Sequence, residues 1–154
     1  PGYLPLDSLV FAEVEDGIIT HFSGDPETVR QVNAHYEHIS SALGVNRHRV
    51  HSWHAGLNPF TSYSGNLSSL ADWKRWESIS FASPRYLHFH TCGDEPPCEI
   101  AWSLFNPSVR VDGERYWHNG QFLWYQRPDN RSLLDRHIGG SALLRESADI
   151  GVGV

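Results

Sequence analysis

Three short turn signals constrain the fold of this 154-residue chain more than any other feature. They are Glu15-Asp16-Gly17, Asp112-Gly113 and Asn119-Gly120, and each joins two short apolar segments. Asp-Gly and Asn-Gly pairs readily adopt the left-handed backbone conformations that close tight β-hairpins. The chain is therefore expected to build antiparallel hairpins, one near its start and others in its second half.

Eight segments have the composition and length of β-strands. They are residues 10–14, 18–22, 49–54, 85–90, 99–104, 108–111, 114–117 and 121–125. Residues 150–154 are interpreted as a frayed end or an edge strand. Most of the expected strands follow residue 85, so the second half of the chain should be mainly β.

Helices are expected at three places. Asp25-Pro26 is a helix start, residues 29–43 carry apolar side chains at helical spacing, and Gly44 is a stop. Residues 67–79 have a similar spacing, and residues 132–146 could be helical with an interruption at Gly139-Gly140. The fold class is therefore α+β, an antiparallel β-sheet or partial barrel with two to three helices.

Length and charge exclude several classes of protein. The 154 residues fit a single domain, 1–154, although one half of a larger precursor would also look like this, since the chain starts at Pro1 and contains no Met. The net charge of -6 and the scattered basic residues argue against nucleic-acid partners, and no apolar run is long enough to cross a membrane. Only two cysteines, Cys92 and Cys98, favour a reduced, cytoplasmic protein over a disulfide framework.

Two histidine pairs are the strongest indication of chemistry. His88 and His90 are two residues apart on an expected strand, so both side chains point to the same face and could hold one metal ion. His51 and His54 are three apart, so only one of them can join that face unless the strand bulges. His54 is favoured as the third metal ligand because the strand opens into a loop beside it, and His51 is kept as a catalytic candidate.

The loop that follows His90 supplies candidate acid/base residues. In a hydrolytic or deaminating enzyme, Glu95 or Glu99 is expected to act as the base that helps metal-bound water attack the substrate. The spacing His88-x-His90-x(4)-Glu95 also matches the first motif of cupin barrels, which His118 could complete as a further ligand. A third hypothesis makes Cys92 a nucleophile, with Asp94 orienting a base.

Aromatic and arginine side chains suggest the kind of substrate. The many Trp, Tyr and Phe residues of the β segments are expected mostly in the core, but an aromatic wall beside histidines would suit a planar, conjugated molecule. Arg85 and Arg110 could hold a carboxylate through two parallel hydrogen bonds. Trp53 lies between the two histidines of its strand and completes the expected substrate-binding set.

The order of several motifs resembles a known family. These motifs are Val14-Glu15-Asp16-Gly17-Ile18-Ile19, Trp53-His54-Ala55-Gly56-Leu57-Asn58-Pro59, His88-Phe89-His90, Val109-Arg110-Val111-Asp112-Gly113 and Trp117-His118-Asn119-Gly120-Gln121-Phe122. Over residues 1–125 the chain resembles the C-terminal half of the aminopeptidase T (thermophilic metalloaminopeptidase) family and the related 2,5-dihydroxypyridine dioxygenases.

The resemblance implies metal ligands in the stretch that holds His51 and His54 and at the pair His88 and His90. Two departures argue against a two-zinc peptidase site: His90 stands where the family has Asp, and the family's Glu near Leu9 and Val10 is absent. A single-metal site or a metal-free hydrolytic site is therefore expected in its place. Members of the family are longer, so this chain would correspond to one half of such a protein.

The sequence therefore predicts an enzyme with one divalent metal, Fe(II) favoured and Zn possible, acting on a small aromatic-derived or conjugated substrate. A ring-cleaving dioxygenase is the first hypothesis. A hydrolase or deaminase of an aromatic-degradation intermediate, a cupin-like metal enzyme and a non-catalytic subunit are the alternatives. A homo-oligomer, or association with a second half of the same precursor, is the expected assembly.

Overall fold

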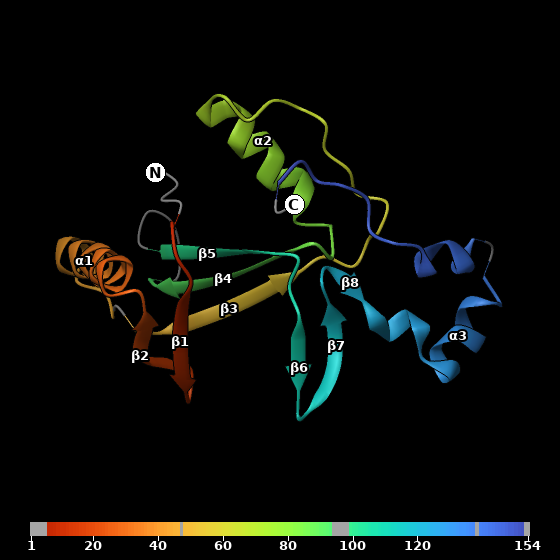
Figure 1. Ribbon diagram of the computed structural model, residues 1–154, viewed down its shortest axis with the longest axis horizontal. Helices are drawn as coiled ribbons and strands as arrows, with labels where there is room; N and C mark the ends of the chain where they lie inside the picture. The colour runs from red at the N-terminus through yellow and green to blue at the C-terminus, as the bar shows by residue number, and fades with distance from the viewer. Residues whose placement is uncertain (1–5, 47, 94–98, 138, 153–154) are drawn as a thin grey trace. The chain divides into compact units, whose positions relative to one another are not determined.

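The computed structural model describes residues 6–46, 48–93, 99–137 and 139–152. It has three helices and eight strands in three small antiparallel sheets, so the expected α+β class is confirmed (Figure 1). None of the three sheets closes into a barrel. Across these residues, no helix has the length and apolar character that crossing a membrane requires.

The chain divides into two compact units, and each is described by itself. The first unit comprises Pro1–Trp53 and Phe89–Trp102, and the second comprises His54–His88 and Ser103–Val154. Three strands, β3 (Val50–Ala55), β4 (Tyr86–Cys92) and β5 (Glu99–Phe105), pair in the order β3-β4-β5. Each of these strands contributes residues to both units.

The first unit opens with the expected hairpin and helix. Strand β1 (Val10–Glu15) pairs antiparallel with β2 (Ile18–Gly24), and Asp16 and Gly17 take positive φ angles in the turn. Helix α1 (Pro26–Leu43) begins where the Asp25 side chain accepts a hydrogen bond from the Thr28 backbone N–H. It ends at Gly44, whose φ of 66° is left-handed, so both ends predicted for this helix are confirmed.

A buried hydrogen-bond chain crosses the core of the first unit. The Trp102 Nε1–H donates to the Tyr36 hydroxyl at 2.6 Å, and the Thr91 hydroxyl donates to the Ile100 carbonyl at 3.0 Å. Since the single Thr91 proton is used in this way, Tyr36 must donate across the 2.5 Å that separates the two hydroxyls. The surrounding core is formed by Ile19, Phe22, Val32, Tyr36 and Cys92.

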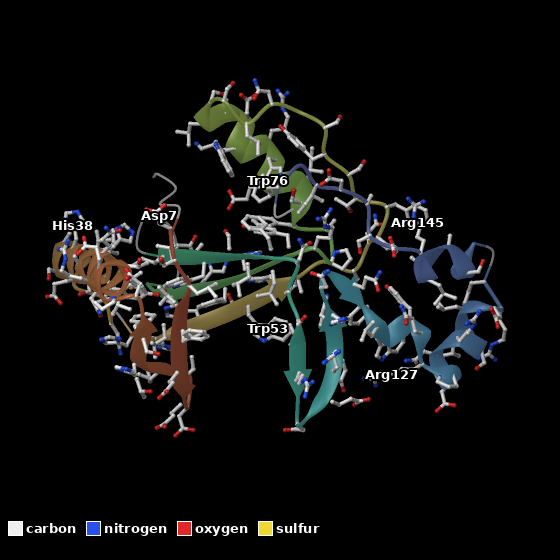
Figure 2. All side chains as sticks on the ribbon, in the orientation of Figure 1. Asp7, His38, Trp53, Trp76, Arg127 and Arg145 are labelled. Atoms are coloured by element: carbon white, nitrogen blue, oxygen red, sulfur yellow. The ribbon has the colours of Figure 1, made fainter. Side chains whose placement is uncertain are left out.

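The second unit is built around Trp76. Helix α2 (Leu70–Ser80) starts with a capping box in which Ser69 and Asp72 bond each other's backbone N–H. From this helix Trp76, labelled in Figure 2, reaches a core that also contains Tyr63, Tyr86 and Ile150. Its indole N–H donates to the Ile150 carbonyl at 2.7 Å, which holds the C-terminal segment against the helix.

The two hairpin turns predicted for the second half are also present. Strands β6 (Val109–Val111), β7 (Glu114–His118) and β8 (Gln121–Phe122) form an antiparallel sheet. Asp112, Gly113, Asn119 and Gly120 all have positive φ, as the hairpin signals require. Each of these two dipeptides therefore forms the tight hairpin turn that the sequence predicts.

The strand expected at residues 121–125 is wrong beyond Phe122. The 3₁₀ helix η1 (Leu123–Gln126) follows β8 at once. A 3₁₀ helix has three residues per turn, which brings Phe122 against Tyr125 at 5.2 Å between ring centroids. Aromatic packing between near neighbours therefore replaces strand pairing here.

The helix expected at residues 132–146 is also wrong in its extent. Helix α3 (Pro128–Leu134) begins four residues earlier, with Pro128 in its first turn, where proline is favoured. The 3₁₀ helix η2 (Gly140–Leu144) follows separately. Gly139 is left-handed with a φ of 78°, so the interruption predicted at Gly139-Gly140 is confirmed.

Gly56, just after β3, gives the first prediction. A Cβ atom there would lie 2.1 Å from the Ala82 carbonyl carbon and 2.4 Å from the Ser83 nitrogen, and both are backbone atoms that cannot turn aside. Gly56→Ala is therefore expected to lower the free energy of unfolding by about 3 kcal/mol, the upper range for overpacking. Urea unfolding followed by circular dichroism measures this loss.

Gly44→Ala is the matched control for this change. A Cβ at Gly44 meets nothing within 4 Å, but its φ is left-handed. The loss there should be only about 1–2 kcal/mol, the cost of the left-handed conformation. If Gly56→Ala lowered the free energy of unfolding by no more than Gly44→Ala does, the backbone near Ala82 would be able to move away at little cost.

Candidate metal site

Three histidines from two neighbouring strands come together in the structure. His54 lies on β3, and His88 and His90 lie on β4. One potential ligand nitrogen from each ring lies within 4.8 Å of the other two. His88 and His90 are held to the same face by the strand that carries both, as their i, i+2 spacing predicts. These are the three residues that the sequence suggested as metal ligands.

The His88 ring stacks on the rings of His54 and Phe81. His54 stacks on it at 4.7 Å between centroids with planes 15° apart, and Phe81 stacks at 4.3 Å with planes 20° apart. His88 is buried, whereas His54 is exposed. The stack therefore gives His88 a nearly fixed ring plane and leaves the His54 ring at the surface. Phe81 was not anticipated from the sequence, because it lies just past the end of α2 with no motif around it.

A single ion would require a modest rearrangement of this stack. Zinc binds imidazole nitrogen at about 2.0–2.1 Å, so tetrahedral donor nitrogens lie about 3.3 Å apart. Metal-bound imidazoles point their ring-nitrogen lone pairs at the ion, and two nearly parallel stacked rings cannot both do so. His54 is the exposed ring of this stacked pair. The three donors lie close enough to hold one ion after a change in side-chain rotation.

His90 has a carboxylate partner on the neighbouring strand. Its Nδ1 lies 2.5 Å from Glu99 Oε2, and the two side chains are only 20% and 18% exposed. Glu99 opens β5, which pairs with β4. Carboxylates in this position orient metal-binding histidines in proteins. The sequence suggested Glu99 as an acid/base residue, and the structure places it against Nδ1 of a candidate ligand.

His51 is placed apart from the three-histidine group. Its Nε2 lies within hydrogen-bonding reach of the Cys92 carbonyl oxygen at the end of β4. His51 and His54 are three residues apart on β3, so their side chains leave opposite faces of the strand. The other catalytic candidate, Glu95, lies outside the described residues, as do Asp94 and Cys98.

The residues suggested for substrate binding are spread over different elements. Arg85 directly precedes β4, and its Nε donates to Asn106 Oδ1 at 2.8 Å while Nη1 lies 3.2 Å from Asp149 Oδ1. Arg110 is exposed on β6, opposite Arg115. Trp53 is 53% exposed on β3. Arg85 therefore ties three chain segments together, a structural role that sequence spacing did not reveal.

Two alternative chemistries involve other residues of the described chain. Cys92, the proposed nucleophile, is 2% exposed and belongs to the core of the first unit. His118, which a cupin site would need, is an exposed residue of β7 beside Arg115. Of the residues described, His54 rather than His118 joins His88 and His90. The structure thus supports a three-histidine set without the cupin motif.

Comparisons with known proteins found no relative of this chain. No family model matches the chain, and no curated protein or solved structure matches it either. The resemblance to the aminopeptidase T and dihydroxypyridine dioxygenase families therefore stays a prediction. The arrangement of His54, His88 and His90 is the observation on which a function can be argued.

Proposed function

We propose that this chain binds one divalent transition-metal ion through His54, His88 and His90 and uses it for catalysis. The grouping of three ligand nitrogens within 4.8 Å of one another is the observation that carries the proposal. Imidazole is the commonest protein ligand for such ions, and three of them suit zinc, iron or copper better than magnesium or calcium.

The three histidines match the number of protein ligands in a catalytic metal site. Structural zinc sites in proteins are closed by four protein ligands, whereas catalytic ones use three and keep a position open for water or substrate. Among the described residues the candidate group has three members. His54 is exposed, so a small molecule could approach the ion from that side.

The metal would decide the chemistry. Fe(II), bound by three protein ligands, supplies oxygen activation, and Zn²⁺ supplies polarisation of a carbonyl or of water. The Fe(II) version matches a ring-cleaving dioxygenase acting on a small aromatic substrate, and the Zn²⁺ version matches a hydrolase or deaminase. We favour the Fe(II) version, because a mononuclear, histidine-rich set suits Fe(II) better than it suits the two-zinc site of a peptidase.

Metal analysis of untagged protein tests the proposal. The purified chain, reconstituted with Fe(II) under anaerobic conditions or with Zn²⁺, is expected to retain about one equivalent of metal, the stoichiometry of a single three-ligand site. His88→Ala/His90→Ala removes two of the three ligands. The affinity of this double variant for the metal should fall by at least about a hundredfold. That is more than the usual effect of losing a residue that only hydrogen-bonds a metal ligand.

His35→Ala/His38→Ala is the matched control. It also removes two imidazoles, but from exposed positions of α1. This double variant should bind the metal as the parent chain does. Equal binding by both double variants, or no stoichiometric metal in the parent chain, would refute the proposed site.

A further inference from the structure

The contact between His90 and Glu99 bears on how the His90 ring is oriented, and not only on which residues could bind a metal. His90 belongs to β4 and Glu99 to β5, so the backbone pairing of two strands brings them together. The nitrogen–oxygen distance is 2.5 Å and both side chains are four-fifths buried. A contact this short and this enclosed restrains the His90 ring more than a surface pair would.

The chemistry of the two groups fixes the direction of the bond. A carboxylate oxygen accepts, so the His90 Nδ1–H donates to Glu99 Oε2. A neutral imidazole carries one N–H, which makes Nε2 the nitrogen with the lone pair. Glu99 therefore selects one tautomer of His90 and fixes the plane in which its Nε2 lone pair points.

We propose that Glu99 is a positioning residue that sets the tautomer and ring orientation of His90 for metal binding. This inference rests on the proposed function, because it presumes that His90 is a ligand. It assigns Glu99 a role different from that of a base acting on substrate or water. The carboxylate acts through the ring, on the side opposite the ligand nitrogen.

The geometry distinguishes this role from direct coordination. Glu99 Oε2 lies against Nδ1, and Glu99 is not a member of the group whose ligand atoms lie within 4.8 Å of one another. A metal bound at Nε2 would be on the far side of the imidazole ring from this contact. The hydrogen bond and the metal bond can therefore exist together on one ring, as in other carboxylate–histidine–metal arrangements.

Zinc affinity of three variants tests the proposal. Glu99→Ala should weaken Zn²⁺ binding roughly ten- to a hundredfold, the usual effect of losing such a partner. Glu99→Gln keeps an oxygen that can accept the Nδ1–H, so it should lose clearly less than Glu99→Ala. Glu13→Gln, a strand residue exposed on β1, removes the same charge and should leave affinity unchanged. Competition with a chromophoric chelator provides the measurement.

A double-mutant cycle separates positioning from a general structural effect. In a His90→Ala background, Glu99→Ala should change Zn²⁺ affinity by less than about twofold, because the two residues act as one unit. The absorption spectrum of bound Co²⁺ adds a second readout. It should keep the same ligand-field pattern in Glu99→Gln as in the parent chain, since no ligand has been replaced.

Several outcomes would overturn this inference. Parent-like affinity in Glu99→Ala would do so while leaving the proposed metal site intact. Equal losses in Glu99→Gln and Glu99→Ala, with an altered Co²⁺ spectrum, would identify Glu99 as a ligand instead. Failure of the parent chain to bind metal would reject both this inference and the proposed function.

Discussion

Replacing Trp76 by alanine is expected to lower the free energy of unfolding by about 4 kcal/mol or more, within or above the range for a fully buried tryptophan. Trp76 has no exposed surface, and its ring contacts Tyr86 at 5.0 Å and Phe105 at 5.7 Å between centroids. The change would also remove the donor to the buried Ile150 carbonyl, which adds the cost of an unsatisfied acceptor. Such a loss is a large part of the stability of a small protein.

Two variants sharpen this test. Trp76→Phe keeps a ring in the core and loses the N–H, so it should destabilise the chain less than Trp76→Ala. Trp53→Ala removes the same side chain from a site that is 53% exposed, and it should cost less than about 1 kcal/mol, as surface changes usually do. Denaturant unfolding and amide hydrogen exchange of the second unit measure these effects. A loss in Trp76→Ala no larger than in Trp53→Ala would contradict the role assigned to this core.

Local signals explain why parts of the fold could be predicted. Asp16-Gly17 and Asn119-Gly120 adopt positive φ angles for reasons contained in the dipeptides themselves. The Asp25 cap and the Gly44 stop likewise act within one turn of the helix that they bound. These features need no distant partner, so a single sequence is enough to predict them.

Long-range packing explains why other parts could not. The β character of residues 121–125 is typical of a strand, yet Phe122 and Tyr125 pack on each other and the backbone turns into η1. Arg85 bonds Asn106 and Asp149, which are 21 and 64 residues away in the sequence. No spacing rule connects residues so far apart, and their contact follows only from the assembled sheet and the C-terminal segment.

The candidate metal site depends both on local sequence signals and on long-range packing. Strand alternation predicts that His88 and His90 share a face and that only one of His51 and His54 can join them. The structure groups His54 with them, and His51 lies instead against the Cys92 carbonyl. The contact of Glu99 with His90 depends on how β4 and β5 pair, which the sequence does not specify. The grouping of these three histidines could thus be predicted from the sequence, while the contact of Glu99 with His90 could not.

Alkaline pH should destabilise the chain through Tyr36. Burial, only partly opposed by the hydrogen bonds with Thr91 and Trp102, raises the pKa of Tyr36 to about 12. An unfolded tyrosine has a pKa of about 10, so the folded state holds the proton more tightly. The stability linked to this difference is fully present below pH 10 and is lost as the pH rises to about 12. The shift corresponds to roughly 3 kcal/mol, at about 1.4 kcal/mol for each unit.

Tyr36→Phe isolates this contribution. At neutral pH the variant should be less stable by about 1–3 kcal/mol, because Trp102 and Thr91 lose their shared partner. Between about pH 10 and 12 its stability should fall less steeply than that of the parent chain, since the group with the raised pKa is gone. Burial also raises the pKa of Tyr86, which both proteins retain, so only the difference between their slopes reports on Tyr36. Urea unfolding at a series of pH values measures both slopes, and parallel slopes would show that Tyr36 titrates as an exposed tyrosine does.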